Sequence, residues 1–341
     1  MRKFLLAVAA PFLALLFALA VTTAILMVSG HPPVDVYKSM WDYGTQPDSL
    51  ILTLNLSTTY YIAAVAVAIG FKMNLFNIGV DGQYRLAAML SAAVAGAAWM
   101  SSLPGFLRVA ITLLVAMAVG AAWAGVAALL KVTRGVSEVI STIMLNYIAT
   151  YLVAYLLKGA AVKVEGSNAT STAVIAESSR VPGISVESWL GTGREIYGLI
   201  FLAIAVGILF WFVLTKTRFG FDLRATGRSE SAAIASGVNV KKMVVTSMIL
   251  SGAIAGLVGM PLLFGQDFAY GDTVQAGLGF AGMSVAQLER YCKRVFHLTP
   301  RQMIHKVRLE HADRKSTRLN SVTLPYLVCR LLLEKKKKHS F

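Results

Sequence analysis

Long apolar runs separated by short polar segments make up most of residues 1–283 of this 341-residue chain. Runs of about twenty apolar residues predict membrane-spanning helices, because a helix of that length matches the thickness of the hydrocarbon core. The runs do not alternate apolar and polar residues as the strands of a membrane β-barrel do. An all-α fold is therefore predicted, a polytopic transmembrane helical bundle with spans at residues 4–28, 50–70, 86–100, 109–130, 139–157, 196–214 and 243–264.

The first run admits a second interpretation. Arg2 and Lys3 precede it, and the triplet Ala18-Leu19-Ala20 is similar to a signal-peptide cleavage site. The run is longer than a typical signal core, however, and many further spans follow it. A retained first helix is predicted.

The segment before the short third run is unusually polar. Residues 71–85 read FKMNLFNIGVDGQYR. They can form a cytoplasmic turn, with Lys72 and Arg85 as its inward charges. They can instead form a broken helix that dips into the membrane, where freed backbone groups line a polar path. The residues alone leave both interpretations open.

Two features of the middle spans bear on packing and charge. The fourth span is rich in Gly and Ala, which let helices approach closely in lipid; the residues are Gly120, Ala121, Ala122, Ala124 and Gly125. Glu138 stands at the edge of the fifth span. We interpret it as a solvated residue at a helix N-terminus, favoured by the helix dipole. A coupling or gating role is the alternative.

Composition agrees with a membrane protein but divides the chain in two. Hydrophobic residues make up 56% of it and charged residues 14%, against about 25% charged in an ordinary globular domain. Residues 1–283 hold 18 Lys and Arg against 13 Asp and Glu, whereas residues 284–341 hold 14 against 4. Both cysteines, Cys292 and Cys329, lie in this basic tail, so the predicted membrane part offers no disulfide or thiolate metal site.

Lys and Arg in the loops predict the orientation. With a cytoplasmic N-terminus, twelve of these residues, Arg85 among them, fall inside and six outside. This arrangement places the polar part of residues 219–256, which precedes the span at 243–264, in the cytoplasm. The middle of that stretch is a small-residue segment bracketed by Gly227 and Gly237, with Ile234 as its one large apolar residue. One isoleucine is a weak membrane anchor, so we expect contact with a protein rather than an interfacial helix on lipid.

Three motifs carry a family resemblance. They are FNIGVDGQ (76–83), GFDLRATGRSESAAIASGVNVKK (220–242) and GLGFAGMSVA (277–286), in that order. Together they resemble the permease subunits of bacterial ABC importers for simple sugars and nucleosides, within the ribose and branched-chain amino acid permease superfamily. The resemblance covers about residues 1–286, and FNIGVDGQ is closer to the nucleoside and general sugar branch.

The resemblance implies an inner-membrane transport subunit surrounded by lipid, with several protein partners. These would be a second permease subunit, an extracytoplasmic substrate-binding protein or lipoprotein, and cytoplasmic ABC ATPases docked within residues 227–239. The residues implied in docking are Gly227, Arg228, Ser229, Glu230, Ala232, Ala233, Ala235, Gly237 and Asn239. The chain has no GxxxxGK[ST] phosphate loop, so ATP and Mg²⁺ would act in the partner, and no cofactor, metal or catalytic residue is expected here.

Polar side chains of residues 71–85 are candidates for the translocation path. Asn74, Asn77, Asp81 and Gln83 could hydrogen-bond to sugar hydroxyls or to a base. Polar groups near lipid are costly and usually face a cavity or a partner. Helix packing or a turn is the alternative for each of them.

The tail departs from the family pattern. Residues 284–312 resemble the second half of an AraC-type helix-turn-helix domain, but half a domain cannot bury a core, so nucleic-acid binding is not expected. Residues 313–341 resemble translated adapter sequence, and an artefact is the favoured interpretation. We expect a truncated permease joined to foreign sequence near Ala286.

Two other functions are kept as alternatives. A secondary transporter or channel would need no ATPase and would carry ionisable residues deep in its spans. A membrane-anchored regulator would need the tail to bind DNA with a steep salt dependence.

Overall fold

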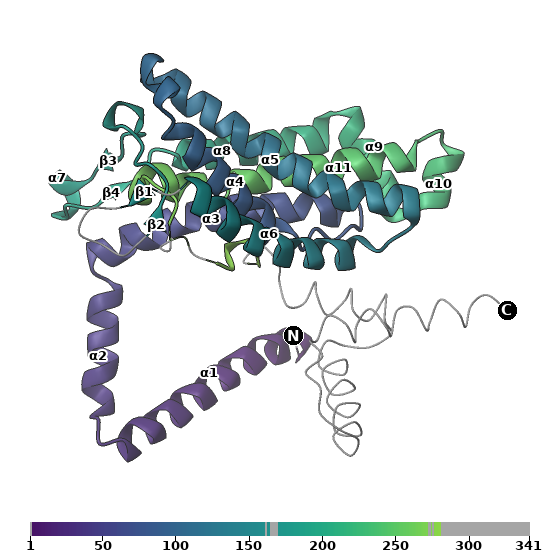
Figure 1. The fold of residues 1–341 in the computed structure, drawn as a ribbon. Helices are drawn as coiled ribbons and strands as arrows, with labels where there is room; N and C mark the ends of the chain where they lie inside the picture. The colour runs from purple at the N-terminus through teal and green to yellow at the C-terminus, as the bar shows by residue number, and fades with distance from the viewer. Residues whose placement is uncertain (1, 161, 164–169, 272–273, 275, 281–341) are drawn as a thin grey trace, which may run out of the picture. The chain divides into compact units, whose positions relative to one another are not determined.

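The computed structural model describes residues 2–160, 162–163, 170–271, 274 and 276–280 (Figure 1). Each of the seven predicted spans falls on a helix, which confirms the all-α bundle. The helices are α1 (Arg2–Val28), α3 (Pro47–Lys72), α4 (Val80–Ala95), α5 (Gly105–Arg134), α6 (Glu138–Ala160), α8 (Ile200–Lys216) and α11 (Val240–Gly256). The predictions for residues 284–341 lie outside the described residues.

Length and composition separate these helices into classes. Four described helices are long and apolar enough to cross a membrane: α3, α5, α6 and the helical stretch from Val240 to Asp267. Two bent pairs raise the number to six if each pair is one span. The pairs are residues 12–28 with α2 (Pro33–Gly44), bent by 119°, and α8 with α9 (Arg218–Arg228), bent by 74°.

The chain divides into two compact units. The first holds residues 1–55 and 184–196, with α1, α2, the start of α3, and a small hairpin. The hairpin pairs β3 (Ile184–Ser185) antiparallel with β4 (Glu195–Ile196) around α7 (Glu187–Leu190). Asp48 at the start of α3 accepts a hydrogen bond from Thr192 and forms an ion pair with Arg194 at 3.7 Å.

The second unit contains the remaining helices and is built around α4. It adds α10 (Glu230–Ala235), α12 (Met260–Leu262), a π-helical turn η3 (Leu263–Asp267), the 3₁₀ turns η1 (Ala98–Ser102), η2 (Glu177–Ser179) and η4 (Leu278–Phe280), and the pair β1 (Val162–Lys163) and β2 (Thr170–Ser171). Most residues of the 16-residue α4 are buried. The helix is therefore a core element, too short to be an ordinary span.

Small residues bring α5 and α11 together, as the Gly- and Ala-rich composition of α5 predicts. A Cβ atom at Gly120 would collide with the backbone of Gly252, and one at Gly252 would collide with Ala124. A Cβ at Gly256 would collide with the carbonyl oxygen of Ala116. These contacts bring the two backbones close enough for extensive dispersion contact, which is how helices associate in lipid.

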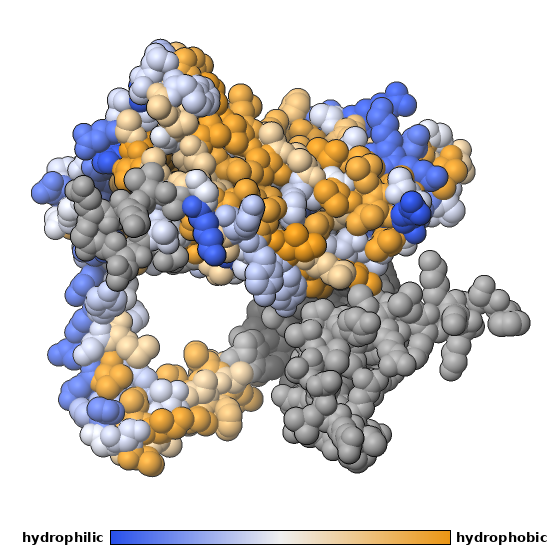
Figure 2. All heavy atoms as spheres, in the orientation of Figure 1, coloured by the Kyte–Doolittle hydropathy of each residue, from blue (hydrophilic) through white to orange (hydrophobic). Residues whose placement is uncertain are grey.

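Polar residues of the second unit concentrate at its helix ends. In Figure 2, hydrophobic residues cover much of the surface over α5 and α6, and hydrophilic residues gather at the end that carries α9 and α10. A membrane-embedded bundle requires this distribution, because its apolar surface faces hydrocarbon and its ends face water.

Candidate functional site

A hook formed by α9, α10 and the first turn of α11 contains all of the predicted docking residues. We call residues 218–242 the hook. Ser229 caps α10 by accepting a hydrogen bond from the backbone N–H of Ala232 at 3.3 Å. Asn239 caps α11 in the same way through the N–H of Lys242, at 3.0 Å. Each cap satisfies a backbone donor that a helix start leaves open, so both ends of the short α10 segment are fixed by local chemistry.

Gly237 ends α10 and turns the chain towards α11. Its φ is +80°, in the left-handed region where glycine carries no Cβ penalty. The N–H of Val238 returns to the carbonyl oxygen of Ala233 at 3.0 Å, which closes the turn. The glycine that the sequence places after the small-residue segment is therefore a helix C-terminal stop.

The outer face of α10 is open. Ala233 is only 2% exposed and packs inward, whereas Ile234 is 63% exposed. Glu230, Ala232 and Ala235 are exposed as well. A short helix attached through one small buried side chain presents nearly all of its surface outward, and its small residues leave room for a partner to approach closely.

Gly227 anchors the hook to the bundle. A Cβ at this position would collide with the carbonyl oxygen of Lys72, at the end of α3. The neighbouring Met73 Cα would lie 2.9 Å from it, closer than real Cβ contacts allow. Because only glycine fits, the C-terminus of α9 rests directly on the backbone of the segment that follows α3.

A groove with a basic lining runs between α9 and the start of α11. Its volume is about 860 Å³, and its lining includes Arg218, Arg224, Arg228 and Lys242 with Asp222 as the acidic member. Predicted docking residues Ser229, Ala232, Ala233, Gly237 and Asn239 line it too. The positive field of this lining favours an acidic partner surface.

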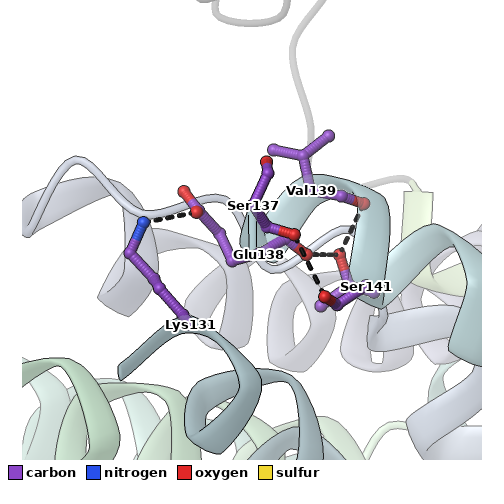
Figure 3. A network of polar contacts seen from close by, with 6 residues as sticks. Lys131, Ser137, Glu138, Val139 and Ser141 are labelled. Carbon is purple, nitrogen blue, oxygen red and sulfur yellow. Dashed lines mark hydrogen bonds and ion pairs between the residues drawn. The ribbon is translucent and has the colours of Figure 1, made fainter. Parts of the chain in front are cut away.

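A second concavity joins the hook to the turn between α5 and α6. It has a volume of about 420 Å³ and is lined by Gly227, Arg228, Ser229 and Glu230 of the hook and by residues of that turn. Lys131 and Glu138 form an ion pair in its lining, with 2.6 Å between Nζ and Oε2 (Figure 3). The pair links the end of α5 to the start of α6.

The burial of Glu138 corrects the sequence prediction. The residue is 4% exposed and is not a solvated helix terminus. Its carboxylate pairs with the Lys131 ammonium in place of water. In the first turn of α6, the Ser141 hydroxyl also donates a hydrogen bond to the Ser137 carbonyl oxygen at 3.1 Å (Figure 3). Burial is possible because the opposite charge lies seven residues upstream, across the predicted turn, a pairing that the sequence analysis did not foresee.

Residues 73–79 fold back and pack into the second unit instead of forming an exposed loop. Met73, Leu75, Phe76, Asn77, Ile78 and Gly79 are all buried. Asn77 donates a hydrogen bond to the Ser251 hydroxyl at 2.9 Å, and that hydroxyl donates to the carbonyl oxygen of Ala66 at 2.6 Å. Ala66 lies well inside α3. The segment is therefore packed into the second unit and is not an exposed loop.

Asn77 and Gln83 satisfy each other. The Asn77 side-chain N–H donates to Gln83 Oε1 at 2.9 Å, and the Gln83 side-chain N–H donates to Asn77 Oδ1 at 2.8 Å. Asn77 Oδ1 also accepts the backbone N–H of Gly79 at 3.1 Å. Both residues are almost fully buried. Their amide groups are engaged in holding the break together, which is the packing alternative for this segment.

Asp81 joins the first motif to the third. Its carboxylate accepts the backbone N–H of Gly277 at 2.7 Å. A Cβ at Gly279 would collide with the backbone N of Asp81. FNIGVDGQ and the start of GLGFAGMSVA therefore meet at the N-terminus of α4, where the helix dipole also favours a carboxylate.

Asn74 lies apart from the other three predicted path residues. It is exposed, with φ of +61°, a conformation that asparagine tolerates better than most residues. It lines the concavity shared with Gly227 and Glu230. The structure thus groups Asn74 with the hook, and Asn77, Asp81 and Gln83 with the start of α4.

Several site residues escaped sequence reasoning. Asn146 of α6 accepts the N–H of Gly82 at 2.8 Å and donates to the carbonyl oxygen of Ile78 at 2.8 Å. Arg85 lies in α4 and donates to the Thr150 hydroxyl at 3.0 Å, midway along α6. Polar residues inside apolar spans were the available signal, since such residues are rare and paired. Among the described residues, no group of three or more His, Cys, Asp or Glu could hold a metal ion.

Comparison with known proteins identifies relatives that cover most of the chain. Residues 49–286 match the family described as "Branched-chain amino acid transport system / permease component". The chain is 33% identical over 281 residues to the guanosine ABC transporter permease protein NupP of Bacillus subtilis. The aligned region covers 82% of this chain and 78% of NupP. No solved structure gives a significant match.

Two further relatives are named for the transport of other substrates. The nucleoside ABC transporter permease protein NupB of Lactococcus lactis is 28% identical over 292 residues, 82% of this chain and 77% of NupB. The glucose ABC transporter permease protein TsgB13 of Haloferax volcanii is 30% identical over 293 residues, 84% of this chain and 75% of TsgB13.

Proposed function

The chain belongs to the family of permease components of the branched-chain amino acid transport system, and on that premise we propose that it is the membrane permease subunit of an ATP-driven importer for a nucleoside or a simple sugar. As a member of this family it is a transport subunit, and ATP is used by a partner ATPase. Family membership favours this function over a secondary transporter or channel and over a regulator.

The exposed α10 carries the proposal for how ATP use reaches the membrane. Ser229 caps the start of the helix and Gly237 turns the chain after its end, its outer face is made of small residues, and Gly227 of α9 holds the hook against the end of α3. A push on α10 is passed rigidly to α3 and α8, because the caps and the close contact at Gly227 leave little slack. The attached spans would then rock and open the path to alternating sides.

The partners follow from the same arrangement. A cytoplasmic ATPase would dock on Arg228, Glu230, Ala232 and Ala235, with the basic groove facing acidic residues of that partner. A second permease subunit would complete the path, and a substrate-binding protein or lipoprotein would deliver the ligand from outside. The N-terminus would be cytoplasmic in the inner membrane, as the Lys and Arg distribution predicts.

The substrate class rests on the named relatives. Two of the three compared above are named for guanosine or nucleoside transport and one for glucose. FNIGVDGQ favours the same two classes. Competition of unlabelled nucleosides and hexoses against uptake of labelled guanosine by cells that carry the complete transporter would separate them.

An uptake experiment tests the coupling assignment. Ala232→Arg with Ala235→Arg puts two bulky charges on the outer face of α10 and leaves its caps and the buried Ala233 unchanged. We expect ATP-dependent uptake to fall to background while the amount of folded permease in the membrane is unchanged. Thr133→Arg, an exposed small residue near the end of α5, is the matched control and should transport normally. Normal uptake by the double variant would refute the docking assignment.

A further inference from the structure

Three tyrosines form an exposed row along α6. Tyr147, Tyr151 and Tyr155 follow one another at intervals of one helical turn and are 58%, 76% and 74% exposed. Residues four apart lie on the same side of a helix, so the three rings form one continuous face. We call these three residues the tyrosine row.

Tyr147 and Tyr151 lie near the middle of the membrane-spanning helix α6. At about 1.5 Å per residue, Tyr147 stands roughly 14 Å and Tyr151 roughly 20 Å along a helix that is roughly 35 Å long. Tyrosine is favoured at the two membrane–water interfaces, where its hydroxyl meets water, and not at mid-depth. Hydrocarbon is therefore a poor environment for these hydroxyls.

Two other spans, α8 and α5, present a different surface to their surroundings, whereas α3 also exposes the tyrosines Tyr60 and Tyr61. On α8 the exposed residues between 201 and 212 are all apolar or aromatic without a phenol, among them Ile204, Ile208 and Phe212. Exposed residues of α5 between 106 and 130 are likewise apolar. In Figure 2, less hydrophobic residues interrupt the hydrophobic surface over α6. The outer face of α6 is thus chemically distinct from these two lipid-compatible faces.

A charged side chain reaches the flank of the row. Arg85 of α4 donates to the hydroxyl of Thr150, the residue before Tyr151, at 3.0 Å. Its Nε is buried and finds no hydrogen-bond partner among the residues that the structure describes. Ionisable groups at membrane depth usually mark the path of a substrate or ion. Arg85 thus meets α6 at Thr150, at the edge of the face that carries the tyrosine rings.

We propose that the tyrosine row and Arg85 form one wall of the translocation path and that the tyrosine rings stack on the base of a transported nucleoside. The inference rests on the proposed function and narrows its substrate class to nucleosides. Every nucleobase has a flat π-face, so stacking on a row of rings tolerates different bases. Successive rings one turn apart let a base move from one to the next without a deep energy well.

Uptake of labelled guanosine by the complete transporter tests this proposal. We expect Tyr147→Leu with Tyr151→Leu to lower the maximal ATP-dependent uptake rate about tenfold, the size of one lost stacking contact. Tyr147→Phe with Tyr151→Phe keeps the rings and should retain most of the rate. Phe212→Leu removes an exposed ring from α8 and should change nothing. If the Leu pair transports like the parent, or if the parent takes up a simple sugar but no nucleoside, the wall assignment is wrong while the importer assignment stands. If the parent takes up neither class, both fail.

A labelling experiment distinguishes the path from its alternatives. In a chain with Cys292→Ser and Cys329→Ser, we expect Tyr151→Cys to react with a water-soluble thiol reagent and guanosine to slow the reaction. Phe212→Cys should not react. A Tyr151→Cys side chain that does not react would indicate lipid, and one that cross-links to a second permease subunit without protection by guanosine would indicate a subunit interface. Either result would overturn the proposal.

Discussion

Two polar motifs of this chain have opposite relations to their surroundings. FNIGVDGQ turns its polar atoms inward, where Asn77 and Gln83 bond each other and Asp81 holds Gly277. The hook uses Ser229 and Asn239 for local caps and presents the rest of α10 outward. Polarity within a membrane protein therefore does not by itself mark a contact site.

The difference assigns the two motifs different tasks. A buried, self-satisfied polar cluster fixes a geometry, because each lost partner leaves an unpaired group in a medium of low dielectric. An exposed, capped helix can meet another protein without rearranging. The first motif should thus be sensitive to substitution through stability, and the second through transport.

The largest expected effect on stability is at Asn77. Asn77→Ala leaves the Gln83 amide and the Gly79 N–H without partners, and each unpaired buried group costs about 1–3 kcal/mol. Asn239→Ala removes one exposed cap, for about 1 kcal/mol. Thermal unfolding of the purified permease in detergent should therefore rank Asn77→Ala well below Asn239→Ala. Equal midpoints would remove the distinction between the two motifs.

Gly227 should follow, because it joins the hook to the bundle. Gly227→Val would force the end of α9 away from Lys72, and overpacking of this kind costs about 1–3 kcal/mol. Gly237→Ala meets no neighbour and suffers only the left-handed φ, for about 1–2 kcal/mol. We expect Gly227→Val to reduce uptake more than Gly237→Ala at matched membrane levels. The reverse order would show that Gly227 does not transmit motion.

The ion pair beside the hook gives a smaller effect. Glu138→Gln leaves the Lys131 ammonium without its counter-charge, but Lys131 is partly exposed, so we expect a loss of about 1 kcal/mol. Lys131→Glu combined with Glu138→Lys restores opposite charges and should recover part of that loss in the same unfolding assay. A reversed pair less stable than Glu138→Gln would mean that the geometry, and not the charge, holds this turn.

The smallest stability effect belongs to the outer face of α10. Ala235→Arg alters an exposed position, so the free energy of unfolding should change by no more than about 0.5 kcal/mol. Uptake should nevertheless fall, since the Arg side chain obstructs docking. A variant that unfolds earlier and transports normally would place Ala235 in the fold and not in the interface.

Much of the fold follows from local patterns that the sequence carries. Apolar runs predicted each described span, small residues predicted a close helix contact of α5, and Gly227 and Gly237 predicted the bounds of the small-residue segment that holds α10. These features depend on neighbours within a few residues. The site depended on distant ones: Asn77 meets Ser251, Asp81 meets Gly277, and Arg85 reaches Thr150. Such pairings are set by helix packing, which periodicity alone does not specify.

Cross-linking between α10 and the partner ATPase tests the central proposal most directly. In the assembled transporter, with Cys292→Ser and Cys329→Ser in this chain, Ala235→Cys should form a cross-link to the ATPase with a short thiol-to-amine reagent. Thr133→Cys should not. The cross-link yield should change when ATP is bound, because we propose that the ATPases move α10 when they bind ATP. A functional transporter in which Ala235→Cys never reaches the ATPase, with or without ATP, would contradict it.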